Sequence, residues 1–147
     1  MKIRKLEPGD FDEWLRMRLA LCPELSAEIH RSEMQAIMVD PTCQTFVAVR
    51  PDGSLGGFLE FDQRKYADNC RTSPVGYIEG WYVDINLQRR GVGKELVEEA
   101  ESWASKQGLH EMASDCMLDN EVSLKAHLAL GYEQGDRLIH FRKKLND

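Results

Sequence analysis

The sequence contains no apolar run that approaches the ~20 residues needed to span a membrane. Its first residues, Met-Lys-Ile-Arg-Lys-Leu-Glu, lack the apolar centre of a secretory signal peptide. Cysteine is sparse, and the 4 cysteines are scattered without a Cys-x-x-Cys pair. These absences predict a cytoplasmic protein that has neither a disulfide framework nor a zinc site, so no metal is expected.

The chain has few positive side chains relative to negative ones. It contains 19 lysines and arginines against 25 aspartates and glutamates, which gives a net charge of -6. Nucleic acids and anionic membranes attract basic surfaces, so neither is expected as the main partner. A cationic substrate would suit this charge better. The chain of 147 residues shows no internal repeat, low-complexity segment or linker, which predicts a single domain over residues 1–147 with its own core.

Local patterns predict a mixed α+β fold. Apolar residues at helical spacing follow Asp10 and Ser26, which are both suitable N-cap residues, and strand-like runs flank the turn 51–53. Helices are expected over 10–22, 26–39, 94–106 and 120–130, and Gly108 and Gly131 are suited to end the last two. Strands are expected over 2–6, 45–49, 55–61, 75–85, 111–115, 132–133 and 137–144, which gives about seven strands.

The most informative segment is Gln88-Arg-Arg-Gly-Val-Gly-Lys94, between a strand-like run and a long amphipathic run. Its glycines allow the backbone to approach an anion closely. Main-chain amides at a helix start, where the macrodipole is positive, bind phosphate well. The cationic side chains of Arg89, Arg90 and Lys94 lie beside them. The segment predicts a pyrophosphate site, and the alternative is an ordinary strand-to-helix turn with a solvated basic rim.

With this loop in place, the order of elements resembles the GNAT superfamily of acetyl-CoA-dependent N-acetyltransferases. Gln88-x-x-Gly91-x-Gly93 stands where that family places its pyrophosphate loop. Asn120 and the run 126–132 resemble the family's closing helix. The resemblance covers nearly the whole chain. It implies a twisted, mostly antiparallel sheet of about seven strands flanked by about four helices, with a splayed strand pair that holds acetyl-CoA.

Other segments are more specific than a glycine loop. The runs 73–80, 111–116, 119–120 and 136–143 resemble the aminoglycoside 6'-N-acetyltransferases of the short chromosomal type, also called type I. This resemblance implies acetyl transfer from acetyl-CoA to the 6'-amine of an aminoglycoside, which is a resistance reaction. It also implies a homodimer, formed through the C-terminal strands.

The resemblance implies which residues bind the cofactor. Main-chain groups of the strand Trp81, Tyr82 and Val83 hold the pantetheine and polarise the thioester carbonyl. Asn120 contacts the cofactor, caps the last helix, or does both. The pyrophosphate is assigned to the loop, whose residues are Gln88, Arg89, Arg90, Gly91, Val92, Gly93 and Lys94.

Acetylation of an aliphatic amine requires a base, because the amine is mostly protonated at neutral pH. Glu79, one strand position from the acetyl group, is the first candidate, and the alternative is a strand carboxylate that faces solvent or pairs with an arginine. Asp115 shares the base role or holds a substrate amine, unless it only caps a helix or turn. Asp136 resembles a substrate carboxylate, although it also fits a Gly-Asp turn. Three carboxylates suit a polycationic sugar.

Tyr66 resembles an aromatic wall of the aminoglycoside pocket, or it anchors its own loop. Two positions depart from the family pattern. Cys22 stands where relatives carry tryptophan before a proline, which leaves the shape of one wall of the pocket open. His127 stands where many members have a tyrosine that protonates the leaving thiolate, so it acts as that acid or lies in a helix interface.

Two other functions fit the same residues. One is acetylation of another amine, such as a polyamine, an amino acid or a protein terminus. The other is a non-catalytic acyl-CoA-binding module that regulates a partner. The carboxylates Glu79 and Asp115, beside the expected cofactor strand, favour an enzyme.

Overall fold

The computed structural model describes residues 1–146, which fall into two compact units. The first unit is Met1–Asp115, and the second begins at Cys116. The first unit holds the sheet and the helices α1 (Phe11–Leu21), α2 (Ala27–Val39) and α3 (Val92–Lys106). The second unit holds α4 (Glu121–Ala129) and the C-terminal segment. No helix in the described part of the chain is both long and apolar enough to cross a membrane.

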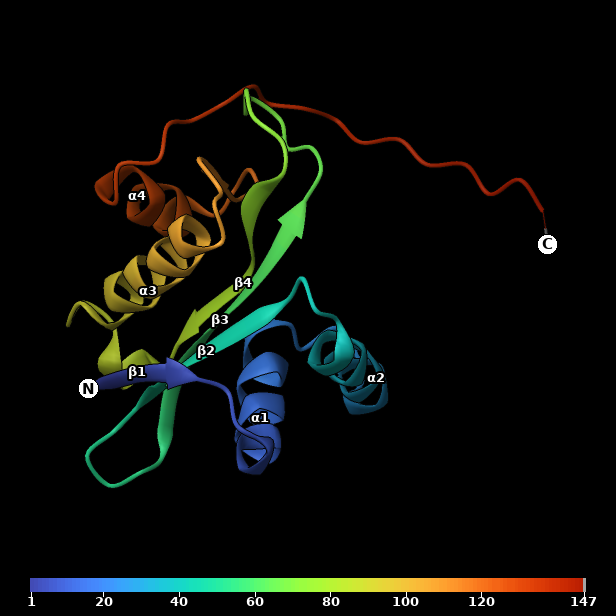
Figure 1. The fold of residues 1–147 in the computed structure, drawn as a ribbon. Coiled ribbons are helices and arrows are strands. Elements are labelled where there is room, and N and C mark those ends of the chain that lie inside the picture. Colours follow the sequence, from blue (N-terminus) through green and yellow to red (C-terminus); the bar gives the residue numbers. More distant parts are fainter. Residues whose placement is uncertain (147) are drawn as a thin grey trace. The chain divides into compact units, whose positions relative to one another are not determined.

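The first unit is built on a sheet of 5 strands in the order β1-β2-β3-β4-β5. Figure 1 labels strands β1 to β4. The strands are β1 (Lys2–Lys5), β2 (Gln44–Val49), β3 (Leu55–Arg64), β4 (Val75–Val83) and β5 (Met112–Ala113). Strands β1 to β4 are antiparallel to their neighbours, whereas β4 and β5 are parallel. The expected α+β fold with a mostly antiparallel sheet is therefore confirmed.

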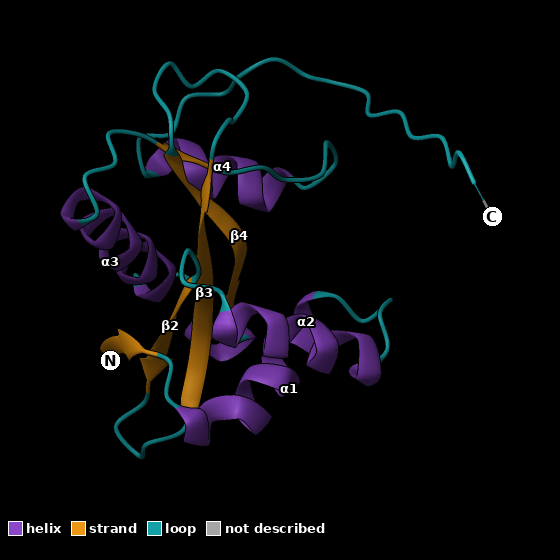
Figure 2. Ribbon diagram, turned by 45° about the vertical axis from the view of Figure 1, so that its right-hand side comes forward, coloured by secondary structure: helices purple, strands orange, loops and turns teal. Residues whose placement is uncertain are grey.

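Helices cover both faces of this sheet. Helices α1 and α2 lie on one face and α3 lies on the other, as the two views of Figures 1 and 2 show. The alternation of buried side chains explains this layering. Phe58 packs in the cluster that contains Trp14 of α1, whereas Phe46 meets Trp103 of α3 edge to face, with the ring centroids 6.3 Å apart. Trp14, Phe46 and Phe58 are fully buried, so the core lies on both faces of the sheet.

Local signals position the first helices largely as the sequence predicts. The Ser26 hydroxyl accepts a hydrogen bond from the Ile29 amide at 3.2 Å, so Ser26 caps α2 as expected. Asp10 occupies the N-cap position of α1, but its side chain makes no capping bond. Instead its carboxylate accepts hydrogen bonds from Arg4 at 2.7 Å and from the Glu7 amide at 2.8 Å.

The two C-terminal strands predicted over 132–133 and 137–144 are wrong for the single chain. After α4, residues 130–146 contain no helix or strand. A strand needs a partner for its main-chain groups, and no other strand in the described chain pairs with this segment. Its apolar side chains are exposed, with Ile139 at 79% and Phe141 at 91%. The described chain therefore has 5 strands in place of about seven.

Candidate active site

One edge of β4 is open for most of its length. Strand β5 pairs with β4 only at Gly76 and Tyr77. Within the described residues, no strand pairs with this edge of β4 farther along, up to Val83. A Cβ atom on Gly76 would lie 2.4 Å from Met112 Sδ and 2.7 Å from the Phe61 ring, so a larger residue there would press on both side chains. The predicted splayed strand pair is thus confirmed, and it leaves main-chain groups of β4 available to an extended ligand.

The predicted phosphate loop connects β4 to α3. A 3-10 turn over Ile85–Leu87 follows β4, and Gly91 adopts φ 81°, a left-handed conformation that favours glycine. The first intrahelical bond of α3 runs from the Glu95 amide to the Gly91 carbonyl, at 3.0 Å. The three preceding amides, those of residues 92–94, lie ahead of that bond at the helix start.

Two contacts fix this loop against β4. The Gln88 side-chain amide donates a hydrogen bond to the Val83 carbonyl at 3.2 Å. A Cβ atom on Gly93 would lie 3.2 Å from the ring of Trp81, so the loop main chain lies close over that indole. Residues 88 to 93 are therefore held on the strand that is expected to bind the rest of the cofactor.

The side chains of the loop contribute less than its main chain. Val92 is buried, at 2% exposure, so only its main chain faces a ligand. Arg89, Arg90 and Lys94 are exposed, and an exposed charge pair contributes at most about 1 kcal/mol. Free amides, a close main-chain approach and flanking cations together fit a diphosphate group.

Glu79 is set out of the regular ladder by a β-bulge. Glu60 pairs with Gly80 and Phe61 pairs with Ile78, so Glu79 is the additional residue on β4. A bulge re-aims the side chain of such a residue, and bulges are common beside active sites. The Glu79 side chain is 30% exposed and can meet solvent or a ligand.

Arg64, the last residue of β3, holds Glu79. Its guanidinium makes two hydrogen bonds to the carboxylate, from Nε at 2.8 Å and from Nη2 at 2.6 Å. These bonds raise the pKa of Arg64. The contacts of Glu79 therefore match the alternative expectation of a carboxylate paired with an arginine, and its role as a base stays a prediction.

Tyr77 joins the two predicted catalytic carboxylates. Its hydroxyl donates a hydrogen bond to the Asp115 carboxylate, and the Arg64 guanidinium lies 3.4 Å from the centre of its ring. Burial, and then the bond to Asp115, raise the pKa of Tyr77, so the phenol stays protonated and donates at neutral pH. Glu79, Arg64, Tyr77 and Asp115 thus form one cluster, called the acidic cluster below.

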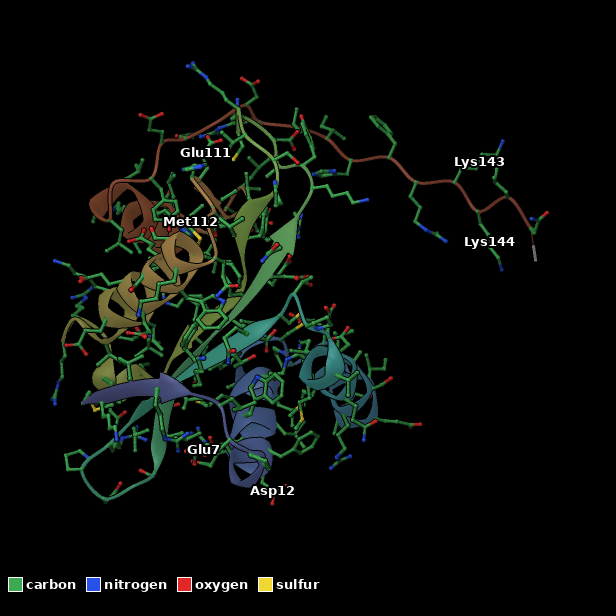
Figure 3. The ribbon with its side chains drawn as sticks, viewed as in Figure 1. Glu7, Asp12, Glu111, Met112, Lys143 and Lys144 are labelled. Carbon is green, nitrogen blue, oxygen red and sulfur yellow. The ribbon has the colours of Figure 1, made fainter. Side chains whose placement is uncertain are left out.

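The segment between β3 and β4 carries Tyr66 and is attached to the start of β5. Glu111 accepts hydrogen bonds from the main-chain amides of Arg71 and Thr72, at 2.8 and 2.7 Å. Figure 3 labels Glu111 and Met112 where this attachment lies. Tyr66 is 70% exposed and donates a hydrogen bond to Asp68 at 3.1 Å. Its ring is accessible for stacking, while its hydroxyl holds its own loop, so both expected roles fit.

Cys22 lies at the end of α1, where its main chain and its thiol are both bound. The Cys22 carbonyl is 2.9 Å from Nε2 of buried His30, and its thiol is 2.9 Å from Glu24. The contact with Glu24 raises the pKa of the Cys22 thiol. A thiol with a raised pKa is a poor nucleophile at neutral pH, which agrees with Cys22 as a wall residue only.

Three predicted site residues belong to the second unit. The Asn120 side chain accepts a hydrogen bond from the Ser123 amide at 3.1 Å, so Asn120 caps α4. His127 Nδ1 lies 2.7 Å from the Ser123 carbonyl, which can only accept, so Nδ1 carries a proton. Asp136 is exposed in the segment after α4. Their roles toward cofactor and substrate stay predictions.

Sequence reasoning missed Arg64, Tyr77 and Glu111. Tyr77 carries a usable signal, since it lies two residues before Glu79 in a strand and residues at that spacing share a face. Arg64 carries none, because its pairing with Glu79 depends on the register of β3 and β4 and on the bulge. Glu111 binds a loop about forty positions earlier in the chain, at a sequence separation of 39 and 40.

Comparison with known proteins gives a consistent result. The model of the acetyltransferase (GNAT) family matches residues 11–132. The chain is 40% identical to an aminoglycoside N(6')-acetyltransferase type 1 of Klebsiella aerogenes over 146 residues, covering 97% of this chain and 96% of that protein.

Solved structures agree with the sequence comparison. The enzyme AAC(6')-Iy, in complex with the bisubstrate analogue CoA-S-monomethyl-acetylneamine, superposes with a TM-score of 0.93 at 32% identity, covering 98% of each chain. An aminoglycoside antibiotic 6'-N-acetyltransferase from Acinetobacter baumannii superposes with a TM-score of 0.92 at 29% identity, covering 99% of each chain.

Proposed function

The chain belongs to the acetyltransferase (GNAT) family, and we propose that it transfers an acetyl group from acetyl-CoA to the 6'-amine of an aminoglycoside. One observation carries the proposal. Glu79 and Tyr77 of the acidic cluster lie on β4, the same strand that has an open edge and supports the phosphate loop. A relative that is 40% identical is named for this activity, and the solved AAC(6')-Iy complex joins CoA to an aminoglycoside fragment.

The residues on both sides of the open edge would hold acetyl-CoA. The main chain from Trp81 to Val83 offers strand hydrogen bonds to an extended pantetheine, and the amides of residues 92–94 face a diphosphate. When bound, acetyl-CoA supplies a thioester whose acetyl carbon becomes the carbonyl of the product amide, while its sulfur leaves as the thiol. Asn120 would add a contact from the start of α4.

Glu79 and Asp115 would prepare the amine. A primary ammonium carries a proton that must leave before the nitrogen can attack, and a carboxylate accepts it directly or through a water molecule. Asp115 already accepts a hydrogen bond from Tyr77, which orients its carboxylate. Glu79 lies at the bulge, and Asp136 would add a third negative charge for a polycation.

A thiol-release assay tests this proposal. We expect acetyl-CoA-dependent thiol release with kanamycin and tobramycin, and none with aminoglycosides that carry a hydroxyl at the 6' carbon. Spermidine and peptides with a free terminus are the comparison substrates for the wider amine class. Turnover with spermidine that exceeds turnover with kanamycin would contradict the proposal, and so would thiol release with the 6'-hydroxyl compounds.

Expression in a susceptible host tests the resistance role. Cells that produce the wild-type chain should grow at a higher kanamycin concentration than cells that produce Glu79→Gln. Equal growth of the two strains, with equal amounts of folded protein, would remove Glu79 from the mechanism.

His127 would return a proton to the leaving sulfur. In the neutral ring the Nδ1 proton faces the Ser123 carbonyl, which leaves Nε2 as the position that a further proton occupies. We expect His127→Ala to lower kcat, because the leaving sulfur loses its proton donor. Unchanged turnover from pH 6 to 9 would discard the acid role.

A homodimer in the cytoplasm completes the proposal. The exposed apolar side chains of residues 138–145 suit a strand that pairs with a second copy of the chain. The free cysteines suit a reducing compartment. Light scattering should give twice the mass of 16.9 kDa, and removal of the residues after Asp136 should give the monomer. A monomeric full-length chain would contradict the dimer.

A further inference from the structure

The acidic cluster contains its own cation, the side chain of Arg64, which occupies the space beside Glu79 and Tyr77. The Arg64 guanidinium holds Glu79 through two hydrogen bonds and lies 3.4 Å from the centre of the Tyr77 ring. Asp115, which accepts the Tyr77 hydroxyl bond, also acts on Arg64 electrostatically and raises its pKa. Carboxylates and an aromatic face are the groups that recognise an ammonium ion.

Arg64 is tied to this position only loosely. Its side chain is 41% exposed and that of Glu79 is 30% exposed, so water competes for both ions. An ion pair of this kind contributes little stability, because solvent screens it and two long side chains lose freedom. By contrast, the Arg18–Glu60 pair on the same face of the sheet is 12% and 6% exposed, and it is fixed further by Trp14. Arg64 can therefore leave Glu79 at low cost.

The contact limits what Glu79 can do. A carboxylate has about four acceptor positions, and the two bonds from Arg64 use half of them. The guanidinium also neutralises the charge that would attract an ammonium. A substrate that binds Glu79 must displace Arg64 or share the carboxylate with it.

We infer that Arg64 is an internal competitor that occupies the ammonium subsite of Glu79, Tyr77 and Asp115 until a substrate ammonium replaces it. This inference rests on the proposed function, since it assigns a cationic amine to the same cluster. It also gives a basis for selectivity. A polycation gains binding energy from several carboxylates at once and therefore displaces Arg64 readily. A substrate with a single ammonium group gains binding energy from one subsite only.

The experiment compares Arg64→Met with the wild-type full-length protein. Methionine keeps much of the length of the stem but carries no charge. At saturating acetyl-CoA, we expect the KM for kanamycin to fall by about 2- to 5-fold, the range that an exposed ion pair provides, with kcat within about 2-fold. A group that merely supports the fold or orients Glu79 would raise KM or lower kcat when removed, so the fall in KM is diagnostic.

Two further variants make the test specific. Lys106→Met removes one positive charge from α3, on the opposite face of the sheet, and it should leave KM unchanged. In calorimetric titrations of kanamycin in the presence of CoA, Arg64→Met should lower Kd in the wild-type background and have no effect in the Glu79→Gln background. If Arg64→Met fails to fold, Arg64→Lys serves instead, because lysine lacks the two-pronged geometry and should give a smaller fall in KM.

The outcomes separate the inference from the proposed function. An unchanged or higher KM in folded Arg64→Met, with an active wild type, overturns the inference alone. A wild type that neither binds nor acetylates any aminoglycoside overturns both. Arg64→Met could also lower the Kd for kanamycin in the Glu79→Gln background. That result would show that Arg64 acts by general charge and not through Glu79, and it would also overturn the inference.

Discussion

The Tyr77 hydroxyl donates a hydrogen bond to the Asp115 carboxylate, and this bond connects β4 to the segment that follows β5. Tyr77 is 7% exposed, so its donor is shielded from water. Strand β5 ends at Ala113, so Asp115 lies beyond its own strand, and the bond from Tyr77 orients its carboxylate. The orientation of Asp115 therefore depends on the neighbouring strand.

Removal of that hydroxyl should affect both stability and catalysis. We expect Tyr77→Phe to lower the free energy of unfolding by about 1–2 kcal/mol and to lower kcat/KM for an aminoglycoside, because Asp115 loses its donor. Urea denaturation and initial rates measure the two effects. In a double-mutant cycle, Tyr77→Phe should add little to Asp115→Asn, and fully additive losses would show that the two residues act separately.

The glycines of the phosphate loop should matter more for CoA binding than its arginines. A Cβ atom at Gly93 would press on Trp81, whereas the Arg90 side chain is exposed. We expect Gly93→Ala to raise the Kd for CoA by about 10-fold and Arg90→Ala by at most about 5-fold, measured by calorimetry. The reverse ranking would count against a site built from main-chain amides.

Gly91 offers a matched control for backbone strain. Gly91 and Gly53 have φ of 81° and 90°, and a Cβ atom at either position meets no atom within 4 Å. Alanine at each should therefore cost a similar ~1–2 kcal/mol of stability. Only Gly91→Ala should also weaken CoA binding, because Gly53 lies in the β2–β3 turn. Equal CoA affinities for Gly91→Ala and Gly53→Ala would show that the left-handed conformation of Gly91 does not matter for CoA binding.

Arg18 has a buried and an exposed partner, which allows a comparison within one network. Glu60 is 6% exposed and lies 2.8 Å from Arg18 Nε, whereas Glu33 is 47% exposed and lies 3.1 Å from Nη1. We expect Glu60→Ala to cost about 3–5 kcal/mol, because a buried guanidinium loses its counter-ion. Glu33→Ala should cost at most about 1 kcal/mol. Similar urea unfolding midpoints for Glu60→Ala and Glu33→Ala would contradict this distinction.

Asp84 should make stability depend on pH. Burial would raise the pKa of Asp84, but hydrogen bonds from Arg16, Arg50 and Tyr82 outweigh it, so the pKa is lower in the folded state. A lowered folded pKa gives stability that is present above the unfolded pKa of about 3.9 and is lost as pH falls through the folded value.

Thermal unfolding between pH 7 and pH 2.5 measures this dependence. We expect the wild-type Tm to fall below about pH 4, and we expect Asp84→Asn to be less stable at pH 7 with a smaller fall in acid. Asp52→Asn is the control, because Ser54 also lowers the pKa of Asp52 but that carboxylate is fully solvated. Parallel Tm curves for wild type and Asp84→Asn would contradict the assignment.

Elements with local signals were predictable from the sequence, whereas contacts across strands were not. Ser26 caps α2 through a bond three residues along the chain, and Gly108 adopts the left-handed conformation expected after a helix. The pairing of Arg64 with Glu79 depends on strand register, which no local pattern specifies. The C-terminal run alternates like a strand, yet pairing needs a second strand that the described single chain does not supply.

The bulge at Glu79 lets one strand serve two sides of the sheet. Because β4 gains a residue there, the alternation of side chains shifts by one position between Tyr77 and Trp81. Tyr77 therefore points to the same side as Glu60, while Trp81 points to the opposite side and lies under Gly93. The number of residues between Tyr77 and Trp81 therefore decides which side of the sheet each side chain faces. With the bulge kept, deletion of one residue between Tyr77 and Trp81 would bring both side chains to the same side of the sheet. The group that is expected to bind the amine would then share a side with the group that lies under the phosphate loop.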